Sequence, residues 1–258
     1  MTKPDNYQVY ADFYFFWIRL NDEKVNAEQR QMELRKYYFK PEPFWENLSP
    51  MVWEELKSAS FTKKHPKKSI IYEEGKYPSG LYIIRKGLVK VFVINHDGSE
   101  QIIYFMGKDE MFGLRSIVSE DTSPVFIETL EDCTVDCIPK AELIRALYGS
   151  TELMAAILRY LGNEFRVFVN KISFFTNRPV SERVALALLV LNEKFNPHQP
   201  LVKAISFSRK DLANYIGIAT ENLIRQLSNL KNSGAIVVKG RRIILHNFEL
   251  LFEQAKLS

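Results

Sequence analysis

A polar face on one predicted helix near the C-terminus carries the most specific chemistry in the sequence. Glu221 and Arg225 are four residues apart, so both side chains lie on the same face of a helix from Thr220 to Asn232. A glutamate accepts a hydrogen bond from the cytosine amino group, and an arginine donates two to guanine. The same spacing also suits an ion pair on a helix surface, so the surrounding elements must decide between these interpretations.

Those elements predict a helix-turn-helix followed by a wing. Ser208 is a suitable N-cap for a helix over residues 209–216, and Gly217 occupies the tight turn that follows. The second helix turns its leucines inward and ends at Gly234, and short strands over 235–239 and 242–245 then surround Gly240-Arg241. In this context the outward polar side chains favour contacts with base edges; they are Thr220, Glu221, Asn222, Arg225, Gln226 and Asn229.

The positive charge of the chain is concentrated in the same module. The whole chain has a net charge of +4, whereas Lys203 to Asn247 contain eight basic and two acidic residues, a net charge of +6. A basic segment on a near-neutral body is typical of a module that binds a polyanion, although a solvated basic face gives the same count.

A long helix over residues 150–175 precedes this module. Its apolar residues recur at spacings of four and three, a heptad seam that comprises Met154, Leu158, Leu161, Phe165, Phe168, Ile172 and Phe175. Such a seam favours pairing with a second copy of the helix, and packing along the chain's own β-domain is the alternative. Arg178-Pro179 ends this helix, and Ser181 is expected to cap the next one, over residues 182–195.

Short runs rich in Ile, Val, Tyr and Phe occupy residues 61–139. They predict strands over 69–72, 80–85, 88–94, 100–106 and 125–129, with a hairpin turn at Asp97-Gly98. Several strands at this spacing indicate an antiparallel roll, so the fold class is α+β.

We therefore expect four parts in the chain. These are an N-terminal extension (1–40), a β-roll (41–149), a dimerisation helix (150–177) and a winged helix-turn-helix (178–258). The extension has seven aromatic residues between Tyr7 and Trp17 and a helical pattern over 21–36. It could dock on the body or on a partner, or native translation could start at Met32.

The composition excludes several classes of protein. With 46% hydrophobic and 26% charged residues, the chain is typical of a globular protein. No apolar run approaches the ~20 residues that span a bilayer, and no secretory signal is apparent. Cys133 and Cys137 are too few for a disulfide framework or an iron–sulfur cluster, and the four histidines are scattered. We expect a cytoplasmic protein that is not an enzyme and has no metal or cofactor.

Taken together, the chain resembles the Crp/Fnr family of bacterial transcription regulators over about residues 45–250. The resemblance is carried by Gly80-Leu81-Tyr82-Ile83, Lys86-Gly87-Leu88-Val89-Lys90-Val91, Asp97-Gly98-Ser99-Glu100-Gln101, Met111-Phe112-Gly113, the link 178–185 and the motif Glu221-x-x-x-Arg225. It implies a cyclic-nucleotide-binding-like roll and a homodimer that binds a two-fold site on double-stranded DNA. RNA polymerase is a further partner that the resemblance suggests.

The resemblance also implies roles for residues of the winged module. Glu221 and Arg225 would read the core of each half-site, and Thr220 replaces an arginine that reads a guanine in cyclic-AMP-dependent members. Phosphate contacts are implied at Ser181, Ser208, Arg209, Asn222, Lys239 and Arg241.

The expected effector pocket departs from the pattern of cyclic-AMP-binding relatives. Leu114 follows Gly113 where those relatives have a glutamate for the ribose, and Thr122-Ser123 replaces the Arg-Ser pair that holds the phosphate. The polar pair that contacts adenine corresponds to Phe168-Val169. Arg115 could bind a different anion or be a surface arginine. We expect a pocket for a small molecule other than cyclic AMP, made from Gly113, Leu114, Arg115, Thr122, Ser123, Phe168 and Val169.

Two alternatives to this sensing regulator remain. The pocket could be vestigial, so that the protein binds DNA without a ligand. The winged helix could instead contact proteins, with the aromatic N-terminus docking on a partner. An enzyme with a cupin-like barrel would need a His/Glu metal set on the strands, which the sequence lacks.

Overall fold

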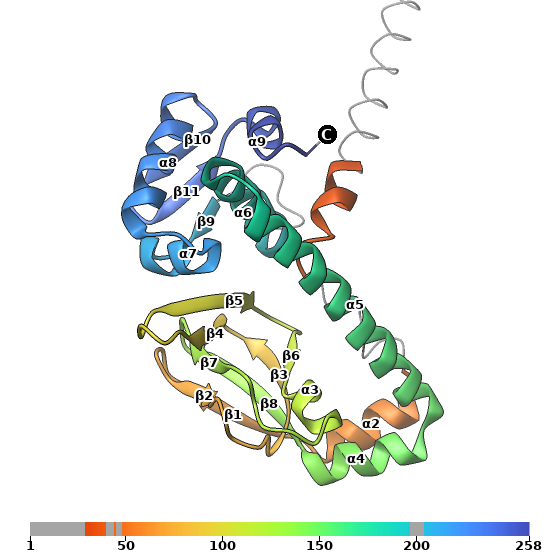
Figure 1. The fold of residues 1–258 in the computed structure, drawn as a ribbon. Coiled ribbons are helices and arrows are strands. Elements are labelled where there is room, and N and C mark those ends of the chain that lie inside the picture. Colours follow the sequence, from red (N-terminus) through yellow and green to blue (C-terminus); the bar gives the residue numbers. More distant parts are fainter. Residues whose placement is uncertain (1–28, 40–43, 45–47, 197–203, 258) are drawn as a thin grey trace, which may run out of the picture.

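The computed structural model describes residues 29–39, 44, 48–196 and 204–257. It has the expected α+β architecture, in which an antiparallel β-roll, a long helix and a winged helix-turn-helix follow one another (Figure 1). The aromatic cluster between Tyr7 and Trp17 lies outside the described residues. Of the helix predicted over 21–36, the described part is helical over residues 29–34.

Two four-stranded antiparallel sheets form the roll. Their strand orders are β1-β8-β3-β6 and β2-β7-β4-β5. The strands are β1 (Phe61–His65), β2 (Ile70–Tyr72), β3 (Gly80–Lys86), β4 (Val89–Ile94), β5 (Glu100–Met106), β6 (Met111–Phe112), β7 (Phe126–Thr129) and β8 (Cys133–Pro139). The predicted hairpin joins β4 to β5, where Gly98 has a φ of 78° and the Asp97 carboxylate accepts a hydrogen bond from the Ser99 amide.

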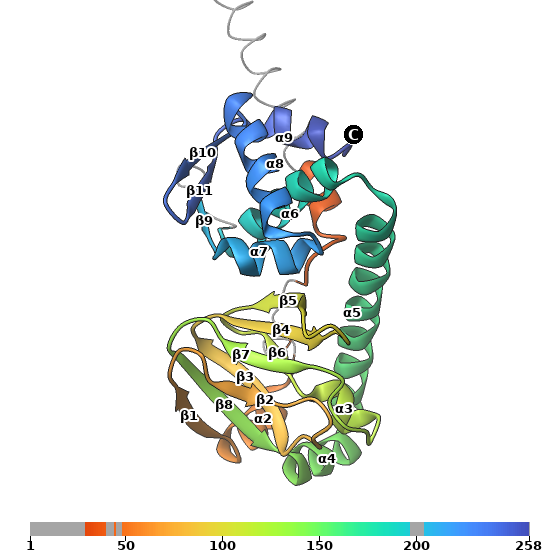
Figure 2. The ribbon, with the colours of Figure 1, turned by 60° about the vertical axis from the view of Figure 1, so that its left-hand side comes forward.

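Helices α2 (Pro50–Ser58), α3 (Leu114–Val118) and α4 (Lys140–Gly149) lie together at one end of the roll, and α4 leads into the long helix α5 (Thr151–Asn177) (Figure 2). The Ser150 side chain caps α5 by accepting from the Leu153 amide. At 1.5 Å per residue α5 is about 40 Å long. It runs from the roll to the winged module and connects them (Figure 1).

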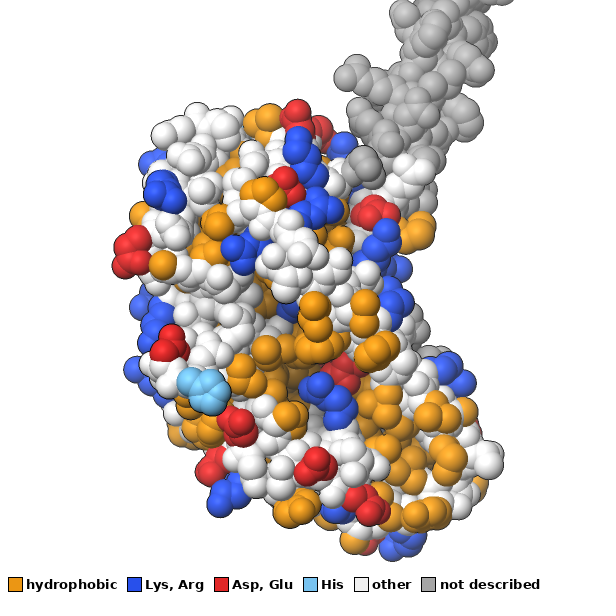
Figure 3. All heavy atoms as spheres, in the orientation of Figure 1, with side chains coloured by type: hydrophobic (Ala, Val, Ile, Leu, Met, Phe, Trp, Pro, Cys, Tyr) orange, Lys and Arg blue, Asp and Glu red, His pale blue; other side chains and the backbone are white. Residues whose placement is uncertain are grey.

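The two faces of α5 differ in what they contact. The buried face packs against the chain itself through Leu153, Ala156, Ile157, Val167, Lys171 and Phe174. Most of the predicted heptad seam lies on the other face, where Met154, Leu158, Phe165, Phe168 and Ile172 are exposed. Leu161 and Phe175 are half-buried against the chain's own cores. Figure 3 shows hydrophobic side chains gathered over α5 and toward α4.

The winged module begins with α6 (Val180–Phe195). It continues through β9 (Ala204–Ser206), α7 (Arg209–Ile216), α8 (Thr220–Asn232), β10 (Ile236–Lys239), β11 (Arg242–Leu245) and α9 (Phe248–Gln254). The predicted turn between the two helices of the motif is present: Ser208 caps α7 by accepting from the Asp211 amide, and Gly217 ends it with a φ of 72°. Strands β10, β11 and β9 form the wing sheet in that order.

The start of α6 differs from the sequence prediction. Ser181 was expected to cap this helix, but α6 begins at Val180 and the N-cap position is Pro179. The Pro179 carbonyl already accepts the first helical hydrogen bond, from the Arg183 amide at 3.1 Å. Ser181 therefore has helical backbone, so its hydroxyl is not at the capping position.

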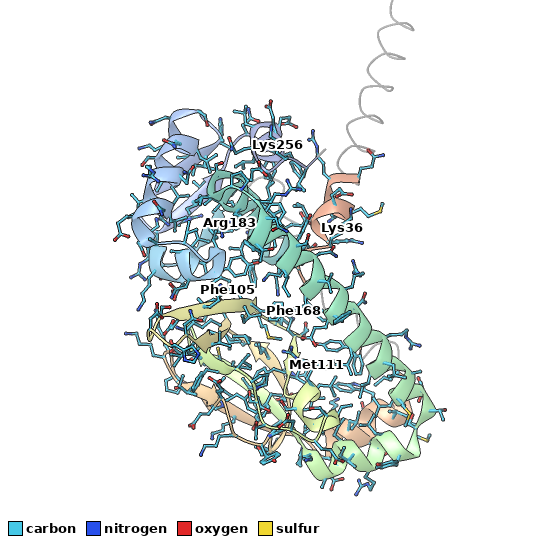
Figure 4. All side chains as sticks on the ribbon, viewed as in Figure 1. Lys36, Phe105, Met111, Phe168, Arg183 and Lys256 are labelled. Carbon is cyan, nitrogen blue, oxygen red and sulfur yellow. The ribbon has the colours of Figure 1, made fainter. Side chains whose placement is uncertain are left out.

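The roll and the winged module share one hydrophobic core. Phe105 of β5 packs against Phe207 and Tyr215 of the winged module, with ring centroids 4.3 and 5.2 Å apart. The Gln101 side-chain amide donates to the Asn214 carbonyl at 2.7 Å. Helix α7 consequently lies directly on β5 (Figure 2), and Figure 4 places Phe105 beneath it.

Candidate nucleic-acid interface and effector cavity

Helix α8 presents a polar face that makes few contacts within the chain. Leu223, Leu227 and Leu230 are buried beneath it, which turns the other side of the helix to solvent. Glu221 and Arg225 are exposed, whereas Thr220 and Asn222 are half-buried. Arg225 donates to the Asn222 side chain at 2.9 Å. The guanidinium therefore has a local partner other than Glu221, and its remaining donors face solvent.

Ile224 is a further candidate on this face that the sequence analysis missed. It lies between Glu221 and Arg225 and is 50% exposed, which is unusual for isoleucine in a folded chain. Aliphatic side chains at such positions contact the thymine methyl group in the major groove. The leucine spacing of α8 could have revealed it, because Ile224 lies outside the buried stripe.

The wing is tied to the first helix of the motif by Arg209. Its guanidinium donates to the backbone carbonyls of Gly240 (2.9 Å) and Arg241 (3.3 Å), which form the turn between β10 and β11. Lys239 and Arg241 extend from this turn and are exposed. The Ser208 hydroxyl is bound to Asp211 of its own capping turn. Two of the predicted phosphate-binding residues, Ser208 and Arg209, thus hold the local structure together.

A cavity lies inside the roll beside α5. Its walls are formed by Phe39, Tyr72, Val91, Tyr104, Met106, Glu110, Met111, Phe112, Gly113, Leu114, Arg115, Ser116, Ser123, Pro124, Val125, Ile127, Tyr160 and Glu164. The space open to the centre of a water molecule is about 40 Å³, enough for a few waters at ~10–15 Å³ each. Of the predicted pocket residues, Gly113, Leu114, Arg115 and Ser123 line it. Thr122, Phe168 and Val169 are not in the lining, and the last two are exposed on α5.

The charged groups of this cavity are paired with each other or with the winged module. Arg115 is the one cation among its lining residues, and its Nε lies 3.5 Å from a carboxylate oxygen of Glu164. Burial raises the pKa of Glu164, and the charge of Arg115 opposes that rise. Glu110 pairs with Lys194 of α6 at 2.8 Å. Among the described lining residues, no unpaired cation is left to hold a phosphate.

Two tyrosine hydroxyls are buried at the cavity wall. Within the described part of the chain, the Tyr104 hydroxyl has no hydrogen-bond partner, whereas the Tyr72 hydroxyl interacts with the Ser116 and Ser123 side chains. Burial raises the pKa of Tyr104 to about 12, so the group stays a neutral donor. Both residues lie in predicted strands. Alternation along β5 would not have marked Tyr104 as inward-facing, because a register shift places Ile102 in the core shared with α6 and Tyr104 in the core of the roll.

Two buried lysines lie where the roll meets the winged module. Lys194 is paired with Glu110 and also donates to the Phe105 carbonyl at 2.7 Å. Lys171 of α5 donates to the Ile103 carbonyl and lies 4.8 and 4.4 Å from the ring centres of Tyr104 and Tyr215. Burial, together with the charge of Lys194, lowers the pKa of Lys171 to about 7. Neither contact has a local signal in the sequence.

The thiols and other ligating groups form no site of their own. Cys133 and Cys137 are buried, unbridged residues of β8, and burial raises the pKa of both thiols. Among the described residues, no three His, Cys, Asp or Glu side chains are grouped to hold a metal ion. None of the helices in the described ranges is long and apolar enough to cross a membrane.

Comparisons with known proteins match both parts of this architecture. Residues 62–148 match the family described as the cyclic nucleotide-binding domain, and residues 182–253 match the Crp-like helix-turn-helix domain. The fumarate and nitrate reduction regulatory protein of Vibrio cholerae is 30% identical over 191 residues, which cover 73% of this chain and 76% of that protein.

Solved structures show the same fold. FixK2 from Bradyrhizobium japonicum has a TM-score of 0.68 at 23% identity, with 76% of this chain and 96% of that chain covered. The c-di-GMP responsive regulator CLP of Xanthomonas campestris has a TM-score of 0.66 at 22% identity, with 77% and 99% covered. With the helix-turn-helix, its basic wing and the roll in place, these matches establish that the chain belongs to the Crp/Fnr family of DNA-binding transcription regulators.

Proposed function

We propose that the protein is a homodimeric regulator that reads a two-fold DNA site through α8. The observation that carries this proposal is the exposed polar face of α8, where Glu221, Ile224 and Arg225 stand above buried leucines. Thr220, Glu221 and Arg225 would contact base edges. Ser181, Ser208, Arg209, Asn222, Lys239 and Arg241 would lie along the phosphates.

The outer face of α5 supports dimerisation. Leu158 and Phe165 are 66% and 69% exposed, and they continue into Met154, Phe168 and Ile172 along one stripe. A contiguous apolar stripe on a long helix is typical of an interface, because water contact with such a stripe is unfavourable. Two copies related by a two-fold axis would cover it and would also place two α8 helices on one DNA duplex.

The cavity supports sensing of a small molecule other than cyclic AMP. Its one lining cation is bound to Glu164, and the Tyr104 hydroxyl is a buried donor without a partner among the described residues. A compact uncharged ligand with a hydrogen-bond acceptor suits these groups better than a cyclic nucleotide does. The small volume of about 40 Å³ favours the second candidate, a regulator that binds DNA with its cavity closed. Either regulator would act in the bacterial cytoplasm, on DNA and with RNA polymerase.

Selection of bound sites from a random duplex pool tests this proposal. We expect the purified full-length protein to select a two-fold site with half-sites about 34 Å apart, one helical turn. Arg225→Ala should weaken binding to this site, and Lys231→Ala is its matched control. Lys231 is exposed in the last turn of α8, and the two changes remove the same charge. Sequence-blind binding by the wild type, with and without cyclic AMP, would refute the proposal. A site that appears only with cyclic AMP would refute the assignment of the cavity.

A further inference from the structure

Residues 29–39 connect the two functional regions although they lie outside both matched domains, residues 62–148 and 182–253. The segment starts beside α6 and α9 and descends along α5 toward the roll (Figures 1 and 2). We propose that this segment, here named the strap, makes the position of the winged module depend on the state of the effector cavity. This inference rests on the proposed effector function and names the element that transmits it.

One end of the strap is attached to the winged module. Arg30 forms an ion pair with Glu249 of α9 at 2.8 Å, and its guanidinium lies 5.1 Å from the ring centre of Phe252. The Gln31 amide donates to Glu193 near the end of α6. These polar contacts fix the helical turn of the strap to two helices of the module at once.

The middle of the strap is part of the core. Leu34 and Tyr38 are 4% and 5% exposed and belong to the same hydrophobic cluster as the buried face of α6. Tyr37 packs edge-on against Phe174 of α5, with ring centroids 5.4 Å apart. Because interiors are close-packed, this portion cannot shift without disturbing α6 and the C-terminal end of α5.

The other end of the strap lies at the cavity. Phe39 is one of the lining residues, and its ring packs edge-on against Tyr160 of α5 at 4.7 Å. The Tyr160 hydroxyl in turn donates to the carbonyl of Met111 in β6, another lining residue of the cavity. Tyr160 and Phe174 are about 21 Å apart along α5 at 1.5 Å per residue. The strap therefore reaches from the cavity to the winged module along the same helix that joins them.

This arrangement gives Phe39 a role in sensing. The cavity is too small for more than a few waters while the Phe39 ring occupies its wall. A ligand that enlarges the cavity on this side must move Phe39, and Tyr37 and Tyr38 follow directly along the chain. Displacing them exposes the core surface that α6 shares with the strap, so ligand binding favours a different position of the winged module.

Hydrogen exchange of the full-length chain tests the strap. Phe39→Ala should accelerate amide exchange in α9 and the end of α6 by at least about threefold, although these helices contact the far end of the strap. Arg30→Ala should accelerate exchange around Met111–Leu114, at the cavity. Met32→Ala is the control, because Met32 lies in the same helical turn but is 64% exposed; it should change neither region. Phe39→Leu, which keeps an apolar side chain, should give a smaller change than Phe39→Ala.

The outcomes separate the strap from the proposed function. If exchange changes only near the substituted residue in both Phe39→Ala and Arg30→Ala, the proposed coupling through the strap is wrong, whatever the DNA result. Binding of the wild type to its selected two-fold site is measured in parallel. If the wild type selects no two-fold site but the long-range exchange effects are observed, the proposed DNA-binding function is wrong and the coupling through the strap is retained.

Discussion

The surface between the roll and the winged module differs from the outward surfaces of α8 and α5 in where its side chains find their partners. The inward surface, where α6 and α7 meet the roll, buries aromatic rings and two lysines whose partners all lie in the same chain. The outward surfaces, α8 and the outer face of α5, expose arginine, glutamate and large apolar side chains with few internal contacts. Changes to the inward surface should therefore alter folding, whereas changes to the outward surfaces should appear only when DNA or a second copy binds.

The largest expected effect is at the inward surface. Glu110→Ala leaves Lys194 7% exposed and without its carboxylate, so we expect the free energy of unfolding to fall by about 3–5 kcal/mol. Urea denaturation followed by circular dichroism measures this change. Adding Lys194→Met should recover much of the loss, since the unpaired charge is then removed. A loss below about 1 kcal/mol would contradict a buried, mutually dependent pair.

The next effect should be confined to the outer face of α5. Leu158→Glu would place one charge from each copy in the proposed dimer interface, weakening association by about 3 kcal/mol, or ~10²-fold. Light scattering across a concentration series should show monomers where the wild type is dimeric, and the urea midpoints should agree at concentrations where both proteins are monomeric. Val118→Glu, on α3, tests whether any exposed apolar residue has the same effect. An unchanged mass for Leu158→Glu would rule out this stripe as the interface.

DNA affinity should respond to the face of α8. Arg225→Ala should cost about 1–3 kcal/mol on the selected site and relax preference at one base pair, without lowering the free energy of unfolding. Fluorescence anisotropy with the site and with single-base variants measures both quantities. Equal losses on all sequences would make Arg225 a phosphate contact.

The smallest expected effect is a pH dependence of the free energy of unfolding, caused by Lys171. Its pKa is about 7 in the folded chain against an ordinary value of 10.5. Between these values the unfolded chain binds a proton that the folded chain has released, so this group makes stability rise with pH by up to about 1.4 kcal/mol per unit. Below pH 7 the contribution is constant, because both states are protonated.

Lys171→Met should flatten the rise in unfolding free energy between pH 7 and about pH 9. Urea titrations of the wild type and the variant at each pH give the difference directly. Lys57→Met, at an exposed position on α2, should keep the wild-type slope. Parallel slopes for wild type and Lys171→Met would show that Lys171 stays charged in the folded state.

The outward surfaces were the part that the sequence predicted well. Helix α8 has its predicted bounds, because inward leucines, the Ser208 cap and Gly217 are local signals. Ser181 was assigned wrongly because a proline before it can occupy the cap position while its carbonyl starts the helix. The exposed seam on α5 also followed from spacing alone.

The inward contacts were largely invisible in the sequence. Lys171 stands in a helix where a lysine is normally solvated, and nothing local indicates that Tyr104 and Tyr215 enclose it. The cavity combines residues from the strap, five strands and two helices, so only some of its members could be carried over by resemblance. Phe39 has no sequence signal, because its place at the cavity depends on a contact with Tyr160, which is 121 residues away in the chain.

The core shared by the roll and the winged module has a consequence for how the chain loses its structure. Phe92, Ile102 and Phe105 of the roll belong to the same cluster as Leu188, Leu212 and Leu227. The roll has two further clusters of its own, but this shared cluster is incomplete in either part alone, so heating should produce one cooperative transition rather than two. A proteolytic fragment carrying the DNA-binding helices alone would expose Phe207 and Tyr215 to water, and aggregation rather than independent folding is its expected fate.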